Sequence, residues 1–102
     1  WRKLMRANKD FSYIVKQVPP IPTIFNFIKE HSGSSDEDMY GNFNMGAGFA
    51  IYLPTEQVEK AKAVAEKHNL KSWNAGIVQT GSKKVVIKSK NITFQAESLG
   101  IR

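Results

Sequence analysis

Residues 42–54 read NFNMGAGFAIYLP, and the fold depends on the structure that this stretch adopts after its two glycines. Gly46 and Gly48 stand one residue apart, and a mostly apolar run leads from them to Pro54. A short apolar run between a turn and a proline is typical of a buried strand. We therefore expect a buried strand at about residues 48–53, entered through a turn that contains the glycines.

The same two glycines raise the alternative of a phosphate-binding loop. A dinucleotide fingerprint needs a strand, then GxGxxG, then a helix, whereas here a predicted helix comes first and a strand comes after it. A Walker loop, GxxxxGK[ST], is also missing. Two interpretations remain. In the structural one, Gly46 adopts a left-handed conformation and Gly48 allows a close approach of the backbone to a neighbour. In the other, Asn42 and Asn44 bind a ligand beside the turn.

Upstream of this stretch the pattern predicts one strand and two helices. The expected ranges are a strand at 10–17, a helix at 22–31 and a helix at 36–43. Gly33 is the expected C-terminal cap of the first helix. Ser35 and Asp38 have the spacing of a capping box at the start of the second.

Downstream the pattern predicts one long helix and three strands. The helix covers about 55–69 with Thr55 as its N-cap, and the strands are 73–79, its hairpin partner 85–88 and a short final strand within 91–102. The expected fold class is therefore α/β (α+β), with a mixed β-sheet packed by two to three helices in a single domain, 1–102.

Composition narrows the classes of partner. The chain has 102 residues with 15 basic and 9 acidic side chains, a net charge of +6 that favours anionic partners but is also common on solvated surfaces. It contains no cysteine, which excludes a disulfide scaffold and a thiolate metal site. No apolar run is long enough for a membrane span. The first residue is Trp rather than Met, so we expect a piece of a longer protein.

The residues suggest no catalytic constellation. His31 and His68 fall at the ends of separate predicted helices, so no metal site is expected. The N-terminal residues 1–9 are basic and form either a short helix or an extended arm, and Arg2, Lys3 and Arg6 are candidates for phosphate contact. No RRM, KH or zinc-finger signature is present, so we expect no nucleic acid partner.

Beyond these patterns, the run VPPIPTIFNFIKEHSGSSDEDMYGNFNMGAGFAIYLP, residues 18–54, and SWNAGIV, residues 72–78, carry a resemblance to a known family. They resemble the C-terminal domain of aminoimidazole ribonucleotide (AIR) synthetase, also called phosphoribosylformylglycinamidine cyclo-ligase. The similarity covers most of residues 18–88, and FNMGAG is its most specific part.

The resemblance implies a C-terminal, cleft-lining domain of a two-domain ligase of purine biosynthesis. The complete enzyme would convert formylglycinamidine ribonucleotide and ATP to AIR, ADP and phosphate, with ATP and magnesium held mainly by an N-terminal domain that also forms a homodimer. The implied partners are that N-terminal domain, ATP and a phosphorylated small-molecule substrate, in the cytoplasm. This domain alone would bind no cofactor and be inactive.

The candidate residues of the cleft combine the resemblance with the basic N-terminus. They are Asn44, Met45, Gly46, Gly48, Arg2, Lys3 and Arg6, with no metal ligand and no assigned catalytic residue. Two alternatives stay open. One is a related ATP-dependent enzyme with a different substrate, and the other is a non-catalytic basic module that binds anions or nucleic acid.

Overall fold

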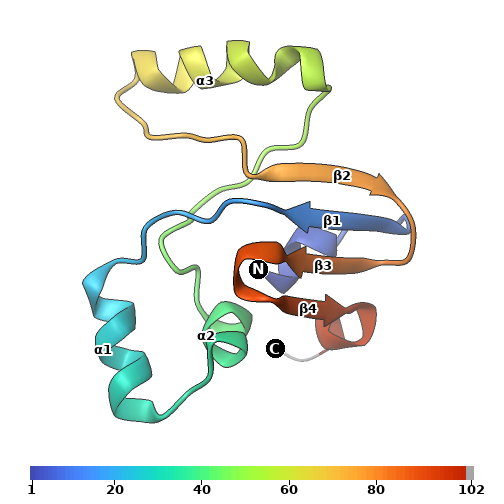
Figure 1. Cartoon of the computed structure of the whole chain (residues 1–102). Helices are drawn as coiled ribbons and strands as arrows, with labels where there is room; N and C mark the ends of the chain where they lie inside the picture. The colour runs from blue at the N-terminus through green and yellow to red at the C-terminus, as the bar shows by residue number, and fades with distance from the viewer. Residues whose placement is uncertain (101–102) are drawn as a thin grey trace.

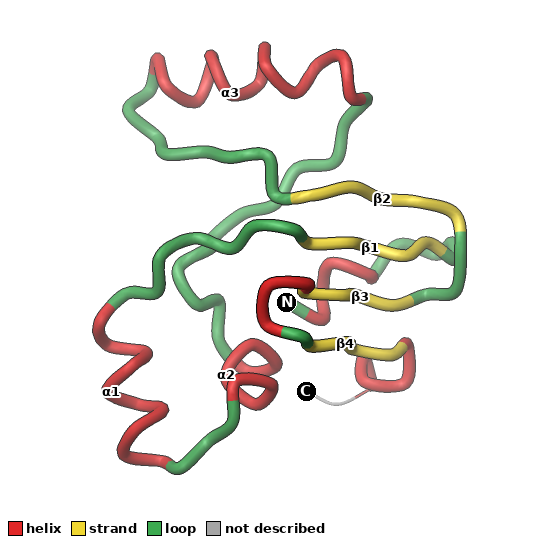
Figure 2. The backbone as a smooth tube through the Cα atoms, viewed as in Figure 1, coloured by secondary structure: helices red, strands yellow, loops and turns green. Residues whose placement is uncertain are grey.

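The computed structural model describes residues 1–100 and shows an α+β fold on a single four-stranded mixed sheet (Figure 1; Figure 2). The strands are β1 (Phe11–Val15), β2 (Gly76–Thr80), β3 (Lys84–Ile87) and β4 (Ile92–Gln95). The helices are α1 (Thr23–Ser32), α2 (Asp36–Asn42) and α3 (Val58–Lys67), and the 3-10 helices are η1 (Arg2–Met5), η2 (Thr55–Gln57), η3 (Lys88–Lys90) and η4 (Ala96–Gly100). A mixed sheet with two to three helices is confirmed.

Strand β1 occupies an inner position of the sheet, whose order is β2-β1-β3-β4. It pairs antiparallel with β2 and parallel with β3, and β3 pairs antiparallel with β4. The predicted hairpin between 73–79 and 85–88 is therefore wrong, since β1 lies between its two strands. The physical reason is burial: every residue from Ser12 to Val15 is buried, and an inner strand shields its side chains better than an edge strand does.

The hydrophobic core lies where η1 and α2 meet β1, β3 and β4. Its buried members are Met5, Tyr13, Val15, Met39, Tyr40, Met45, Val85, Ile87, Ile92 and Phe94. Burial of this much apolar surface is the main favourable term in folding. The core therefore fixes η1 and the C-terminal end of α2 against the sheet.

The two helices that precede the glycine stretch begin and end within one residue of the predicted ranges, 22–31 and 36–43. Gly33 ends α1 in the left-handed conformation, with φ of 73°. At the start of α2 the Ser35 hydroxyl accepts a hydrogen bond from the Asp38 amide at 3.1 Å, and the Asp38 carboxylate accepts one from the Ser35 amide at 3.3 Å. This confirms the capping box. A hydrogen bond of 2.7 Å from Lys29 to Asp36 joins the two helices.

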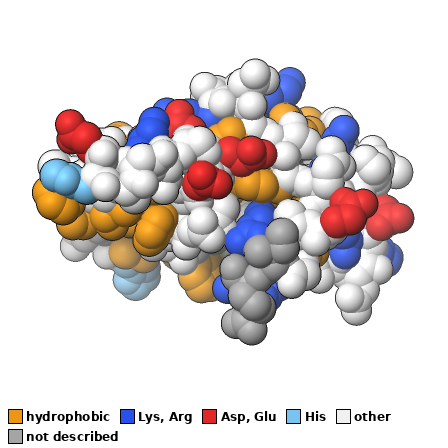
Figure 3. Space-filling view, turned by 90° about the horizontal axis from the view of Figure 1, so that it is seen from below, with side chains coloured by type: hydrophobic (Ala, Val, Ile, Leu, Met, Phe, Trp, Pro, Cys, Tyr) orange, Lys and Arg blue, Asp and Glu red, His pale blue; other side chains and the backbone are white. Residues whose placement is uncertain are grey.

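Part of α1 remains exposed. Ile24 and Phe27 are 57% and 55% exposed, whereas Phe25 and Ile28 pack against the core. Seen from below, hydrophobic side chains gather on the surface at the side where α1 lies (Figure 3). Single exposed apolar residues are normal, but a contiguous group is typical of a surface that contacts something else.

The strand predicted at 48–53 does not form. These residues have no regular secondary structure, and Phe49 and Ile51 are 88% and 67% exposed. The segment cannot pair with the buried strand β1, because β2 and β3 occupy both edges of that strand, and it pairs with neither edge strand of the sheet. The segment is held instead by Tyr52, whose hydroxyl donates to the Leu4 carbonyl at 2.9 Å and whose ring lies 5.6 Å from that of Tyr13.

The helix predicted at 55–69 is divided into η2 and α3. Thr55 makes no capping hydrogen bond, so its predicted role as N-cap is wrong. Figure 1 and Figure 2 show α3 beyond β2, separated from the rest of the helices, and none of its residues is buried. Within residues 1–100 the longest helices have 10 residues, and none is suited to cross a bilayer.

Candidate functional site

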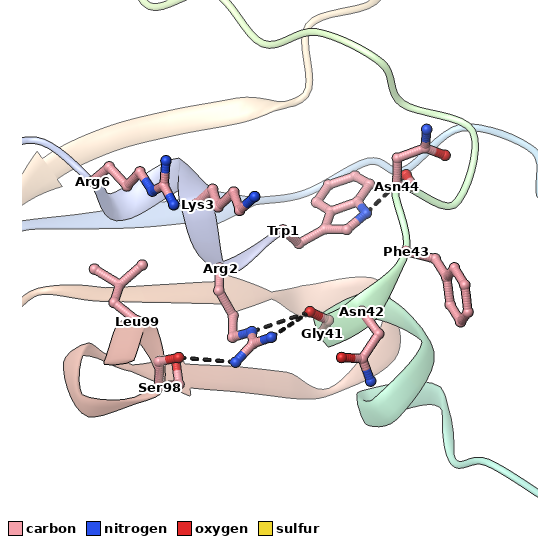
Figure 4. A pocket seen from close by; sticks show the side chains of 10 residues that line it. All are labelled: Trp1, Arg2, Lys3, Arg6, Gly41, Asn42, Phe43, Asn44, Ser98 and Leu99. Atoms are coloured by element: carbon pink, nitrogen blue, oxygen red, sulfur yellow. Dashed lines mark hydrogen bonds between the residues drawn. The ribbon is translucent and has the colours of Figure 1, made fainter. Parts of the chain in front are cut away.

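A pocket of about 230 Å³ lies between η1, the end of α2 and η4. These three elements come from opposite ends of the chain and its middle, and the core described above holds them together. Figure 4 shows the side chains around the pocket. The lining residues are Trp1, Arg2, Lys3, Arg6, Gly41, Asn42, Phe43, Asn44, Ser98 and Leu99.

Arg2 ties the three elements to one another. Its Nε and Nη2 donate to the Gly41 carbonyl at 3.1 and 2.8 Å, and its Nη1 donates to the Ser98 carbonyl at 2.9 Å. A guanidinium has five donors in a rigid fork, which suits it to bridging two carbonyls. Arg2 therefore builds the pocket wall and neutralises carbonyl dipoles at the end of α2.

Trp1 fixes the segment that comes after α2. The indole Nε1 donates to the Asn44 carbonyl at 3.0 Å, and the ring packs edge-on against Tyr40, with centroids 5.4 Å apart. Burial raises the pKa of the Tyr40 hydroxyl, with a smaller contribution from the Asp36 carboxylate. Tyr40 therefore stays neutral under the wall of the pocket, and it is a packing residue rather than an acid or base.

Asn44 shapes the turn at the glycines. Its Oδ1 accepts a hydrogen bond from the Gly46 amide at 2.9 Å, and its own carbonyl also accepts from Ala47 at 3.0 Å. This side-chain turn is common for asparagine and suits the φ of 97° at Gly46. Because Oδ1 is engaged by the turn, the amide nitrogen of Asn44 is the part of this side chain that has no partner within residues 1–100.

Lys3 and Arg6 supply positive charge that the fold leaves uncompensated. Both side chains are exposed, and neither forms an ion pair or a hydrogen bond with any residue in the described range 1–100. Figure 4 shows them leaving η1 in a different direction from Arg2, which turns toward Gly41 and Ser98. Among residues 1–100 the lining contains three cationic side chains and no carboxylate. Such a pocket attracts small anions.

The structure brings together four of the predicted site residues and separates three. Arg2, Lys3, Arg6 and Asn44 line the pocket. Met45 is 2% exposed and belongs to the core. A Cβ at Gly46 would lie 2.9 Å from Pro22 Cδ, so this glycine faces the prolines, and Gly48 has nothing within 4 Å of a Cβ position. The left-handed conformation of Gly46 is confirmed, and the close approach expected at Gly48 is wrong.

Sequence reasoning missed several lining residues. Gly41 contributes a backbone carbonyl, while Ser98 and Leu99 reach the pocket only through the path of the sheet. Nothing local in the sequence marks these residues, because their role depends on contacts between distant parts of the chain. Trp1 carried a signal, since an aromatic residue beside basic ones is typical of anion and base contacts. Within residues 1–100 no group of three or more His, Asp or Glu side chains is placed to hold a metal ion.

Comparisons with known proteins agree with this architecture. Residues 12–89 match the family model described as AIR synthase related protein, C-terminal domain. A phosphoribosylformylglycinamidine cyclo-ligase of Methanococcus maripaludis is 34% identical over 97 residues, which are 95% of this chain and 28% of that protein. The protein of the same name from Methanocaldococcus jannaschii is 35% identical over 76% of this chain and 22% of its own length. The one from Bacillus subtilis is 37% identical over 61% of this chain and 18% of its own length.

The chain thus spans less than a third of the length of these curated relatives. No solved structure matches it.

Proposed function

The chain belongs to the family of AIR synthase related protein C-terminal domains, and from that premise we propose that it is the C-terminal domain of an ATP-dependent cyclo-ligase of purine biosynthesis. The proposed reaction converts formylglycinamidine ribonucleotide and ATP to aminoimidazole ribonucleotide, ADP and phosphate. The observation that carries the proposal is the 34% identity to a cyclo-ligase over 95% of the chain.

The part that this chain would take in the reaction is binding and positioning. A ring closure driven by ATP depends on holding two phosphorylated molecules in register and excluding water from them. The basic pocket supports this role, since Lys3 and Arg6 line it and pair with no carboxylate of residues 1–100. ATP would be bound with an N-terminal domain of the complete enzyme, which we propose as the partner of this domain, in a cytoplasmic homodimer. Because residues 1–100 offer no cluster of metal ligands, we assign no magnesium contact to them.

The proposal is tested with the full-length protein that carries this chain. Purified protein is incubated with formylglycinamidine ribonucleotide and ATP, and aminoimidazole ribonucleotide and ADP are measured together. Equal amounts of both products are expected, and neither should form when the substrate is left out. Turnover of another substrate with none of this one would contradict the proposal and favour a related ATP-dependent enzyme.

A single variant separates a role of the glycine turn in the reaction from a role in folding. Asn44→Ala in the full-length protein is expected to lower turnover by about tenfold or more, because positioning errors near a substrate are costly. Circular dichroism and the thermal midpoint check that the fold survives. Loss of stability with unchanged turnover per folded molecule would show that Asn44 serves only the turn.

The second candidate function is a non-catalytic module that binds anions or nucleic acid. The exposed Lys3 and Arg6 and the net charge of +6 favour it. Affinity for single-stranded RNA is measured at two salt concentrations beside affinity for ATP. Tight RNA binding that weakens steeply with salt, together with no turnover by the full-length protein, would favour this candidate over the ligase.

A further inference from the structure

We infer that the pocket between η1, α2 and η4 is a subsite for a phosphate monoester, and that it takes the ribose 5-phosphate end of a substrate rather than the triphosphate of ATP. The inference rests on the proposed function for the identity of that substrate. The site itself is argued from the pocket's charge, size and walls.

The positive side chains that line the pocket favour a phosphate group as the ligand. Lys3 and Arg6 reach the pocket without partners in the described range 1–100, and Arg2 adds a third positive charge in its wall. A phosphate monoester carries close to two negative charges at neutral pH and accepts several hydrogen bonds. The ammonium of Lys3 and the guanidinium of Arg6 are the donors available to it.

The volume of the pocket favours a sugar phosphate over ATP. The pocket has a volume of about 230 Å³, below the lower bound of about 300 Å³ that is usual for sites of drug-sized molecules. A phosphate with its pentose suits such a space. A nucleoside triphosphate adds a base and two further phosphates, and only its terminal phosphate would enter.

The walls are already in place before any ligand binds. Trp1 is held by Asn44, and Arg2 is held by Gly41 and Ser98, so the segments after α2 and β4 are fixed relative to η1. The half-buried side chains of Trp1 and Leu99 offer apolar surface to a sugar. Preorganised walls reduce the cost of ordering on binding.

The basic half of the pocket lies outside the segment that defines the family. The family match covers residues 12–89, whereas η1 and Ser98 and Leu99 lie before and after it. Membership of the family therefore does not by itself assign a ligand to these residues. The subsite arises from contacts between the two flanks of the chain.

The inference is tested by binding to the 102-residue chain, without any enzymatic readout. Nuclear magnetic resonance titration and calorimetry are carried out with ribose 5-phosphate, ribose, inorganic phosphate and ATP. Ribose 5-phosphate is expected to shift the amides of residues 2–6, 41–44 and 98–99, and inorganic phosphate to compete with it. Ribose should not bind. Binding of ATP at these amides with equal or higher affinity than ribose 5-phosphate would overturn the assignment.

Charge-matched variants separate the pocket from the general charge of the surface. Lys3→Gln combined with Arg6→Gln is expected to weaken ribose 5-phosphate binding by at least about tenfold, the effect of losing two partly exposed charge contacts. Lys67→Gln combined with Lys71→Gln removes the same charge near α3 and should leave affinity within about twofold. Equal losses in the two double variants would overturn the inference.

Asn44→Asp offers a third variant that keeps the turn. The new carboxylate still accepts from the Gly46 amide, but it adds a negative charge to the lining of the pocket. Ribose 5-phosphate binding should be lost while the thermal midpoint stays close to that of the original chain. Unchanged affinity would count against the site.

The two proposals fail in different ways. Binding of ribose 5-phosphate by this chain, with no aminoimidazole ribonucleotide formed by the full-length protein, would support the subsite and contradict the proposed function. Formation of aminoimidazole ribonucleotide, with unaltered KM in the Lys3→Gln and Arg6→Gln double variant, would support the proposed function and contradict the subsite.

Discussion

Helices α2 and α3 differ in a way that reverses what their lengths suggest. α2 has 7 residues, begins with a complete capping box and buries Met39 and Tyr40 almost completely. α3 has 10 residues, has no side-chain cap and buries none of its residues. Short helices in water are marginal and owe most of their stability to packing. Burial, rather than helix length, therefore decides which part of this molecule is firmly ordered.

The same contrast holds for the regions around these helices. We call η1, α2 and the sheet the packed region, and residues 47–75 the α3 arm. The buried core lies in and beside the packed region, whereas the arm exposes large apolar side chains at several positions. These are Phe49, Ile51, Tyr52, Val64 and Leu70. Regions with few buried contacts open locally at low free energy.

Truncation of one side chain in each helix tests the contrast most strongly. Met39→Ala removes a side chain that is 1% exposed, and we expect the free energy of unfolding to fall by about 2–5 kcal/mol. Val64→Ala in α3 alters a side chain that is 50% exposed, and a change within about 0.5 kcal/mol is expected. Urea unfolding monitored by circular dichroism measures both. Similar losses for the two variants would show that α3 is packed after all.

Replacing one glycine in each region by alanine is expected to give the next largest difference in stability between the packed region and the α3 arm. At Gly76 a Cβ would overlap the Ile14 carbonyl oxygen across the β1–β2 pair, so Gly76→Ala is expected to cost about 2 kcal/mol because backbone must shift. Gly48 in the α3 arm has open space around it, and Gly48→Ala should change stability by less than about 1 kcal/mol. The free energies of unfolding are compared by urea titration. A neutral Gly76→Ala would mean that β2 does not pair with β1 this closely.

Removal of the Tyr40 hydroxyl has a smaller effect of opposite sign. This buried oxygen has no hydrogen-bond partner within residues 1–100, and an unsatisfied buried group costs about 1–3 kcal/mol. Tyr40→Phe should therefore raise the free energy of unfolding by about 1 kcal/mol. The thermal midpoint and urea unfolding of the variant and the original chain check it. A destabilised Tyr40→Phe would reveal that the hydroxyl does have a partner.

The smallest expected effect concerns the contact that joins the arm to the packed region. Burial, and to a lesser extent Tyr13, raises the pKa of Tyr52 to about 12, whereas an unfolded tyrosine titrates near about 10. Folding therefore favours the protonated hydroxyl that donates to Leu4. The resulting stabilisation is complete below about pH 10 and is lost as pH rises toward 12.

Ultraviolet titration of the original chain and of Tyr52→Phe measures this difference. The original chain should show one more high-pKa tyrosine than the variant, and its stability should fall more steeply above about pH 10. Titration of Tyr52 near the value of a free tyrosine would show that the arm is not attached at Leu4.

Local features of the fold were predictable and pairings were not. Ser35 and Asp38 interact across a single helical turn, so their spacing alone identifies the capping box. The apolar run at 48–53 has the composition of a strand, but composition does not say whether an edge is available for it. Pairing of β2 with β1 rather than β3 places Gly76 opposite Val15, a contact between distant segments that local sequence does not mark.

The residue types of the candidate site were also predictable from the sequence, whereas their arrangement was not. Arg2, Lys3, Arg6 and Asn44 were predictable by residue type, because each carries donors that suit a phosphate. Their meeting in one pocket, and the part played by Ser98 and Leu99, depends on the folded chain. Met45 lies beside Asn44 in sequence but turns into the core, since a methionine at a turn gains more from burial than from exposure.

The parallel pairing of β1 with β3 also bears on how the chain folds. Ser12 faces Lys84, so this strand pair joins segments that are separated by all three α-helices and most of the sequence. Closing so long a loop costs conformational entropy before the hydrogen bonds and packing of the strand pair can stabilise the chain. Folding rates fall as the average sequence separation of contacts rises. The sheet is thus expected to assemble late, after capped local elements such as α2, with its slow step set by the topology of one strand pair.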